Sequence, residues 1–352
     1  MRSKAPLAQM AGLSVVNPSH VLHQTEVSRR AGELFGGNLA SFSRLRPVYE
    51  NAEIDTRYSC VPIEWYQEAH GFGARNDLFL SNAVDLLERA TLEALDKTRH
   101  GIDDIDGIIA VTSSGVATPS LDALLMERLD MRRNMQRLPV FGLGCAGGVL
   151  GLARASQMAA SQPGKLFLLL VVELCGLTFR SRDFSKSNVI ATALFGDGAA
   201  AALIGTELKG DAAITGFGEH TWRNSLDVMG WDVTDDGLSV IFSRDIPTHV
   251  RQRMGEAMTG FLADQGVALD QIDHFLCHPG GAKVLEALEE IFGLEPGGLH
   301  HSRETLRNFG NMSAVTVLFV VAAALKDGAR GQALLSTLGP GFTAGFLTMD
   351  LT

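Results

Sequence analysis

Short runs of apolar residues alternate along the chain with longer stretches in which apolar side chains recur every three or four positions. The runs include residues 138–141, 166–172 and 334–336, and the first two are bounded by glycine or charged residues. Runs of this length predict buried strands, and the stretches between them predict amphipathic helices. This alternation favours an α/β fold with a buried sheet covered by helices. Pro139 is expected at the start of its strand, because proline lacks the amide donor that a sheet interior uses.

One strand-containing unit occurs twice. Residues 102–111 (IDDIDGIIAV) match residues 269–278 (LDQIDHFLCH), 167 positions later. Each copy predicts a helix end, a turn made by the aspartates and a short buried strand that leads into a glycine-containing loop. At nearly the same separation, Cys145 corresponds to Asn311, and each precedes an apolar helix, predicted at 149–160 and 314–325.

The repeat predicts a chain built by duplication. We expect two similar halves, residues 1–208 carrying Cys145 and residues 209–352 carrying His278 and Asn311. Stacked together, they would form a five-layer α-β-α-β-α sandwich. A polar stretch at 174–194 has no counterpart in the second half. It is expected to cover either the site or an interface.

Composition and charge narrow the class of protein. The 352 residues are 46% hydrophobic and 20% charged, with a net charge of −10, which excludes a disordered chain and argues against nucleic acid or an anionic membrane as the main partner. The most apolar stretch, 313–325, is shorter than the ~18 residues that cross a bilayer, so no stable membrane insertion is expected. Four cysteines without a Cys-x-x-Cys pair, and no apolar leader, predict a reduced, cytoplasmic protein.

The segment 142–148 (GLGCAGG) lies between a predicted strand and a predicted helix. Its Gly-x-Gly-x-x-Gly spacing suits a dinucleotide site, which needs an acidic residue about 20 positions on, and Glu173 leaves that interpretation open. It does not explain Cys145. A helix N-terminus stabilises a thiolate, and the flanking glycines admit a substrate carbonyl and its backbone donors. Cys145 is therefore a nucleophile or a buried structural cysteine.

Two further polar residues belong to corresponding parts of the duplicated halves. His278 ends the predicted strand 275–277, where a catalytic and a structural histidine are both common, and Asn311 between Gly310 and Met312 is either a helix N-cap or a site residue. Because strand ends and helix starts meet at one edge of an α/β sheet, the duplication predicts that Cys145, His278 and Asn311 converge on one crevice.

In order and spacing, residues 144–148 (GCAGG), 278–281 (HPGG) and 310–313 (GNMS) resemble the type III polyketide synthases, the chalcone synthase family. Further matches lie at 173–180, 194–200 and 338–342. The resemblance covers nearly the whole chain and implies the thiolase fold, which is the duplicated five-layer sandwich expected above.

The resemblance also implies roles. Cys145 would carry the acyl chain, held as a thiolate beside an imidazolium, while His278 and Asn311 would polarise the malonyl thioester carbonyl during decarboxylation. Phe195 is similar to the phenylalanine that guards the acyl tunnel. No metal, nicotinamide or flavin is expected, because the substrates are already activated as CoA thioesters.

The substrate is inferred from pocket residues that the resemblance assigns: Ser114, Thr118, Cys175, Gly176 and Phe195. Plant chalcone synthases carry methionine at the position of Thr118 and alanine at that of Gly176, so a wider tunnel is expected here. Cys175 is similar to a cysteine of bacterial members that accept long fatty acyl starters. We expect a medium- or long-chain acyl-CoA starter, malonyl-CoA extension and an alkylpyrone or alkylresorcinol product. Short-starter or malonyl-only naphthalene synthesis stays open.

Contacts to CoA and to partners rest on the resemblance alone. Arg44 is a candidate for a CoA phosphate, or else a solvated surface arginine, and Asn51 stands where plant enzymes have a lysine. The resemblance implies a homodimer, with the loop 113–119 near the partner subunit. Two alternatives are a ketoacyl-ACP synthase III-like enzyme, in which His-Gln-Ala-Asn would replace HPGG, and a non-catalytic relative that acts as a binding partner.

Overall fold

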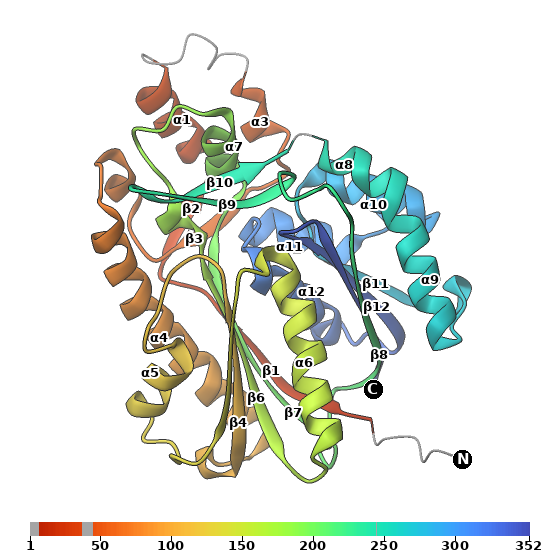
Figure 1. Cartoon of the computed structure of the whole chain (residues 1–352). Helices are drawn as coiled ribbons and strands as arrows, with labels where there is room; N and C mark the ends of the chain where they lie inside the picture. The colour runs from red at the N-terminus through yellow and green to blue at the C-terminus, as the bar shows by residue number, and fades with distance from the viewer. Residues whose placement is uncertain (1–6, 37–44, 244) are drawn as a thin grey trace.

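The computed structural model describes residues 7–36, 45–243 and 245–352. Nine of its strands form one mixed sheet in the order β11-β12-β13-β8-β1-β7-β6-β4-β5 (Figure 1). These strands are β1 (Gln9–Val16), β4 (Ile105–Thr112), β5 (Gln136–Phe141), β6 (Leu166–Leu174), β7 (Asp197–Gly205), β8 (Ala212–Thr221), β11 (His274–Cys277), β12 (Gly331–Gly339) and β13 (Thr343–Leu351). Two separate ribbons pair β2 (His20–His23) with β3 (Thr56–Ser59), and β9 (Met229–Thr234) with β10 (Gly237–Phe242).

The large sheet consists of two half-sheets joined by a narrow link. β1 and β8 pair through two residue pairs, Gln9 with Ala213 and Met10 with Ala212. In contrast, β13 and β8 pair along nine residues. Strands β1 and β4–β7 therefore form one half-sheet, and strands β8 and β11–β13 form the other. The boundary predicted between residues 208 and 209 stays a prediction; it falls in the connection between β7 and β8.

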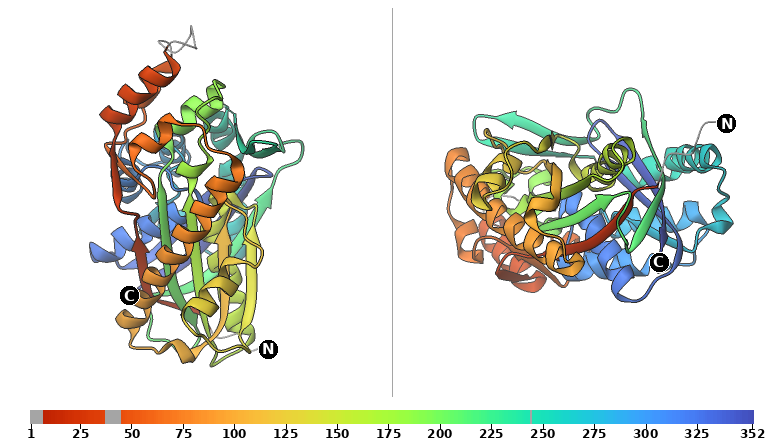
Figure 2. Two further views of the ribbon diagram at one scale, coloured as in Figure 1. Left: turned by 90° about the vertical axis from the view of Figure 1, so that its left-hand side faces the viewer. Right: turned by 90° about the horizontal axis from the view of Figure 1, so that it is seen from below.

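Helices fill the space between the half-sheets and cover their outer faces (Figures 1 and 2). The apolar helices α6 (Gly147–Ser161) and α12 (Thr316–Lys326) pack in one core against strands of both halves. Helices α4 (Phe72–Thr98) and α5 (Leu121–Arg128) cover the other face of the first half-sheet. Helices α9 (Gly255–Gln265) and α10 (Ala282–Phe292) do the same for the second. The expected five-layer α-β-α-β-α sandwich is confirmed.

The alternating direction of side chains along each strand creates these layers. β6 and β7 are buried along their whole length. In β6, Phe167, Leu169 and Val171 point into the central core, whereas Leu168, Leu170 and Val172 point to the α4 side. Successive side chains of a strand face opposite sides of a sheet, so a continuous apolar run fills two cores at once.

The duplication is visible in the elements themselves. Helical turns at Ile102–Asp104 and Leu269–Gln271 lead into β4 and β11 at the expected separation. Helical turns at Gly144–Ala146 and Ser313–Val315 then lead into α6 and α12. These last two turns are 169 residues apart, so the position equivalent to Cys145 is Ala314. Asn311 lies in the corresponding loop, three residues earlier.

Three shorter helices lie together at the end of the molecule drawn at the top of Figure 1. They are α1 (Gln24–Phe35), α3 (Pro47–Glu50) and α7 (Lys186–Leu194), and α1 and α3 both contact α7. Among the described residues, the other α-helices are α8 (Ile246–His249) and α11 (His300–Phe309). None of the described helices is both long enough and apolar enough to cross a bilayer.

Pro139 differs from its expected place. It lies inside β5, opposite Ala110, and not at the start of the strand. The strand tolerates it because β5 is at the edge of the sheet and pairs only with β4.

Candidate active site

Cys145 lies in the helical turn between β5 and α6, and this turn is fixed to both halves of the fold. The amide of Gly144 donates to Ser113 Oγ at 2.9 Å, and Thr337 Oγ1 donates to the carbonyl oxygen of Cys145 at 2.6 Å. Gly144 has φ +47°, and a Cβ there would lie 2.6 Å from the ring of Pro340. Glycine is therefore required for the approach of this turn to β12.

The structure brings Cys145, His278 and Asn311 to one cavity of about 40 Å³, which we call the Cys145 cavity. His278 follows β11, and its amide donates to the carbonyl of Ser336 at 2.8 Å. The rest of the wall is mostly apolar and comes from the second half and the β9–β10 ribbon: Met229, Phe242, Ile246, Met254, Gly280, Val284, Leu288, Ser336, Thr337 and Leu338.

Asn311 is held in one orientation. Its Nδ2 donates to the carbonyl of Gly280 at 3.2 Å, and its Oδ1 accepts from the amide of Ser313 at 2.8 Å. The second bond supports the turn before α12, so the capping role and the position in the cavity occur together. Nδ2 has a second hydrogen to offer a ligand.

The backbone of Asn311 is also tied to the segment that carries Phe195. Its amide donates to the carbonyl of Leu194 at 2.8 Å, and its carbonyl accepts from the amide of Gly196 at 3.0 Å. The residue in the Cys145 cavity and the residue before β7 therefore share one backbone bridge between the two halves.

Burial controls the charge of the Cys145 and His278 side chains. It raises the pKa of the Cys145 thiol to about 12, with the charge of Glu173 acting in the same direction, and it lowers the pKa of His278 to about 3. Cys145 Sγ lies 3.7 Å from Ser313 Oγ, to which it can donate a hydrogen bond. The resting pair is thus a neutral thiol and a neutral imidazole. This differs from the expected thiolate and imidazolium, because desolvation opposes both charges.

Both ring nitrogens of His278 lack a hydrogen-bond partner within the part of the chain that the structure describes. A neutral imidazole offers one N–H donor and one acceptor nitrogen. His278 can therefore accept a proton at one nitrogen and donate a hydrogen bond from the other.

Glu173 lies outside the lining of the Cys145 cavity, but its charge acts on the Cys145 thiol. The sequence analysis considered it for a dinucleotide and as part of the family-like segment 173–180. Glu173 lies near the end of β6, fully buried, and accepts hydrogen bonds from the amide of Ser113 at 3.0 Å and from Ser114 Oγ at 2.6 Å. Burial raises its pKa to about 7. Its carboxylate is thus engaged with the loop that also holds Gly144, and the dinucleotide interpretation is wrong. An acidic residue at the end of an apolar strand was the available signal.

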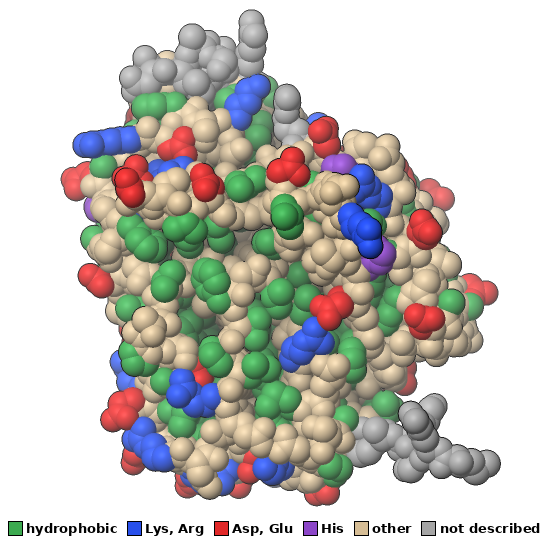
Figure 3. All heavy atoms as spheres, viewed as in Figure 1, with side chains coloured by type: hydrophobic (Ala, Val, Ile, Leu, Met, Phe, Trp, Pro, Cys, Tyr) green, Lys and Arg blue, Asp and Glu red, His purple; other side chains and the backbone are tan. Residues whose placement is uncertain are grey.

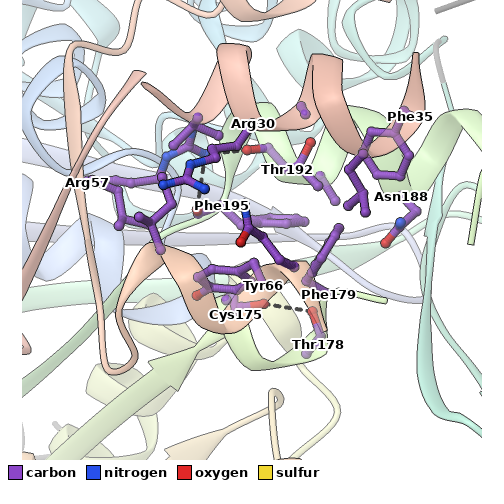
Figure 4. Close-up of a pocket in the computed structure, with 18 of the residues that line it drawn as sticks. Arg30, Phe35, Arg57, Tyr66, Cys175, Thr178, Phe179, Asn188, Thr192 and Phe195 are labelled. Carbon is purple, nitrogen blue, oxygen red and sulfur yellow. Dashed lines mark hydrogen bonds between the residues drawn. The ribbon is translucent and has the colours of Figure 1, made fainter. Parts of the chain in front are cut away.

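The predicted pocket residues are divided among cavities. Phe195, Cys175 and Gly176 line a cavity of about 100 Å³, which we call the large cavity (Figure 4). Ser114 lines a third cavity of about 10 Å³, the small cavity. Thr118 is exposed and lines none of the three. The sequence therefore grouped residues that the fold separates.

Gly176 does not widen the large cavity in the expected way. A Cβ at this position would lie 2.4 Å from the hydroxyl of Tyr66, and the Gly176 amide donates to Asp197 Oδ1 at 2.7 Å. The space left by the missing side chain is therefore occupied by Tyr66.

The large cavity is enclosed by α1, α7 and the segment between β6 and α7, so the extra stretch 174–194 covers part of the site. Figure 4 shows the aromatic side chains of Tyr66, Phe179 and Phe195 around this space. Most of the remaining wall is apolar: Leu22, Val27, Ala31, Leu34, Phe35, Ile63, Ala191 and Val240. Polar groups come from Arg30, Arg57, Gln67, Thr178, Asn188 and Thr192. Arg44, the candidate for a CoA phosphate, lies outside the described residues.

Comparison with known proteins identifies the family. Residues 49–208 match the N-terminal domain of the chalcone and stilbene synthases, and residues 221–349 match their C-terminal domain. A putative chalcone synthase of Bacillus subtilis is 36% identical over 346 residues, which covers 94% of this chain and 95% of the relative. A 1,3,6,8-tetrahydroxynaphthalene synthase of Streptomyces peucetius is 36% identical over 351 residues, covering 97% and 92%.

A solved structure agrees. The 1,3,6,8-tetrahydroxynaphthalene synthase of Streptomyces coelicolor, a bacterial type III polyketide synthase, superposes with a TM-score of 0.93 at 26% identity, over 98% of this chain and 99% of that one. These matches favour the chalcone synthase resemblance over the ketoacyl-ACP synthase III-like alternative. The chain belongs to the chalcone and stilbene synthase family, the type III polyketide synthases, and is an enzyme of the acyltransferase type.

Proposed function

We propose that this enzyme loads a medium- or long-chain fatty acyl group from CoA onto Cys145 and extends it repeatedly with malonyl-CoA. The chain then cyclises to an alkylpyrone or alkylresorcinol. The observation that carries this choice of starter is the large cavity, an apolar space whose wall includes Phe195 and Cys175.

In the loading step, Cys145 Sγ attacks the carbonyl carbon of the acyl-CoA thioester. A new S–C bond forms, and the bond between that carbon and the CoA sulfur breaks. The thiol proton passes to the free acceptor nitrogen of His278 and from there to the departing CoA sulfur. A neutral starting pair supports this route, because the transfer then coincides with attack.

In the extension step, malonyl-CoA loses CO₂, and the electron pair left on its α-carbon forms a thioester enolate. The enolate oxygen accepts hydrogen bonds from the His278 N–H and the Asn311 Nδ2–H. The α-carbon then attacks the acyl carbonyl on Cys145, a C–C bond forms, and the S–C bond to Cys145 breaks. The Cys145 thiolate takes up one proton from solvent, and the β-ketoacyl-CoA product can be loaded again.

The course of the acyl chain follows from the backbone bridge. Phe195 lines the large cavity, while Asn311, bonded to the residues on either side of Phe195, lines the Cys145 cavity. An acyl chain on Cys145 that passes Phe195 would enter a space lined mainly by apolar and aromatic side chains. Each buried CH₂ group then contributes about 0.8 kcal/mol.

A second candidate is synthesis of a tetrahydroxynaphthalene from malonyl-CoA alone. Its support is similarity, because two relatives with that activity in their names match over nearly the whole chain. Such a reaction needs no apolar acyl pocket. The two functions therefore differ in whether the large cavity contributes to turnover.

The proposal is tested with the purified enzyme, malonyl-CoA and either no starter, hexanoyl-CoA, dodecanoyl-CoA or hexadecanoyl-CoA, with products identified by mass spectrometry. We expect the highest kcat/KM with the longer starters. Ala191→Phe fills the large cavity from α7 and should lower kcat/KM for dodecanoyl-CoA about tenfold or more, the effect of losing roughly two buried CH₂ groups. The control is Ala263→Phe, at an exposed position of α9. Product from malonyl-CoA alone, with no response to Ala191→Phe, would favour the second candidate.

We also propose that the enzyme acts as a homodimer. β5 is an unpaired edge of the sheet, and exposed apolar side chains include Val116 and Phe141. Figure 3 shows apolar side chains across the centre of one face and charged side chains mainly towards its margin. Light scattering after gel filtration should give twice the chain mass; a monomer at all concentrations would contradict this.

A further inference from the structure

The β9–β10 ribbon contributes lining residues to all three cavities. Leu238, Val240 and Phe242 of β10 alternate along the strand and therefore share one face. Leu238 lines the small cavity, Val240 the large cavity and Phe242 the Cys145 cavity. The end of the ribbon next to its turn, which carries Leu238 and Val240, thus affects the width of the small and large cavities, whereas Phe242, at the other end of β10, borders the Cys145 cavity.

Arg75, in the first turn of α4, connects the β9–β10 ribbon to the wall of the large cavity. Its side chain is buried, and Nη1 lies 3.4 Å from each of the carbonyl oxygens of Leu177, Thr178 and Phe179. Nη2 donates to the carbonyl oxygen of Asp236, in the turn between β9 and β10. Thr178 itself lines both the large and the small cavity.

Burying the charged guanidinium of Arg75 carries a cost in free energy, because the group loses its hydration. Burial lowers the pKa of Arg75, and no ion pair of Arg75 is found among the described residues, so backbone carbonyls replace the usual carboxylate. A planar guanidinium offers five N–H donors in a fixed fork and can bond in two directions at once. A lysine ammonium concentrates its donors at one point and cannot span the same two segments.

The packing of the ribbon turn agrees with this arrangement. Gly237 has φ +95°, and a Cβ there would lie 2.4 Å from the ring of Phe72. The first turn of α4 therefore contacts the turn of the ribbon in two ways, by close packing at Phe72 and by a hydrogen bond from Arg75. Elsewhere the ribbon is held by Arg180, which donates to Ser239 Oγ, and by Trp231, whose Nε1 donates to the carbonyl of Ser113.

We propose that Arg75 is a positioning residue that sets the width of the large cavity. It fixes Thr178, on one wall, relative to the β9–β10 ribbon, whose Val240 lines the same cavity. Arg75 does not reach the Cys145 cavity, so it acts on the choice of starter and not on decarboxylation. This inference rests on the proposed function, in which the large cavity receives the acyl chain.

The test compares Arg75→Met, Arg75→Lys and, as a matched control, Arg89→Met, which replaces an exposed arginine of the same helix that also donates to a backbone carbonyl. Steady-state kcat and KM are measured for hexanoyl-, dodecanoyl- and hexadecanoyl-CoA, and CO₂ release from malonyl-CoA is measured without starter. Arg75→Met should raise KM for the best wild-type starter about tenfold and shift the preferred chain length, with CO₂ release unchanged. Arg75→Lys should give a smaller change than Arg75→Met, and Arg89→Met should have no effect.

Gly237→Ala provides a second route to the same change if Arg75→Met does not fold, because it moves the ribbon turn without touching Arg75. An unchanged starter profile, or an equal loss for every starter together with CO₂ release, overturns the inference. If the wild-type enzyme uses only short starters or malonyl-CoA, the proposed function fails. The role of Arg75 is then still tested by comparing two effects of Arg75→Met: the change in KM for the starter that the enzyme uses, and the change in CO₂ release.

Discussion

Glu173 should make the stability of the fold depend on pH in a defined direction. Burial raises its pKa in the folded chain from 4.5 to about 7, against the opposing effect of hydrogen bonds from Ser114 and Ser113. At about 1.4 kcal/mol per pKa unit, this difference corresponds to about 3 kcal/mol in the free energy of unfolding.

The sign follows from proton binding. Below the unfolded pKa of 4.5 the carboxyl is protonated in both states, and the full contribution to stability is present. As the pH rises towards about 7, the unfolded chain has already lost the proton that the folded chain keeps. The free energy of unfolding therefore falls through this window and stays lower above it, because the folded state must then bury a charge.

Glu173→Gln keeps the shape of the side chain and removes the titration. Denaturant unfolding of both proteins should show the wild type losing about 3 kcal/mol relative to the variant between about pH 4 and pH 8. Asp197, whose pKa burial raises to about 6, titrates in both proteins and cancels in the difference. A constant difference across the window would mean that the hydrogen bonds cancel the effect of burial on the pKa, and the reasoning would be refuted.

Three further results are expected. Cys145→Ala should abolish polyketide formation but leave part of the CO₂ release from malonyl-CoA, measured in parallel; loss of both would assign the cysteine a role in decarboxylation. His278→Ala and Asn311→Ala should each slow CO₂ release by ~10²–10³, the cost of one oxyanion donor, and wild-type rates in either would contradict its role. Gly176→Ala should lower the free energy of unfolding by roughly 1–3 kcal/mol, as overpacking does, because the new Cβ meets Tyr66; denaturant midpoints at equal m-values measure this, and an unchanged midpoint would show that Tyr66 yields freely.

The layers of the fold were predictable because they depend on local patterns. The repeated segments 102–111 and 269–278 form the same turn and strand in both halves, and the apolar runs fill two cores from one strand. The convergence of Cys145, His278 and Asn311 followed from this symmetry, since equivalent loops of stacked halves meet.

Properties that depend on distant partners were not predictable in the same way. The ionisation of Cys145 is set by how deeply the finished fold buries it, and local sequence predicts only the helix N-terminus that favours the thiolate. Gly176 was expected to open space, but Tyr66, far away in sequence, fills that space. Thr118 and Ser114 belong to one loop, yet nothing local to that loop fixes which residue faces the interior.

The β9–β10 ribbon and Arg75 show the same limit. A run such as 229–242 indicates a hairpin at most, and an arginine near the start of a helix is usually solvated. Only the assembled fold brings the carbonyl of Asp236 and those of Leu177–Phe179 to one guanidinium.

The bridge between Asn311 and the residues flanking Phe195 constrains how such an enzyme can diversify. A mutation that shifts the main chain at Phe195 would also displace the Asn311 carboxamide in the Cys145 cavity, so under the proposed function a new substrate range gained there would lower turnover. Side chains that line the large cavity from α1, such as Ala31 and Leu34, lie outside this bridge. Natural variation and directed evolution of starter preference should therefore accumulate on α1 and on α7 before Leu194, leaving the bridge itself unchanged.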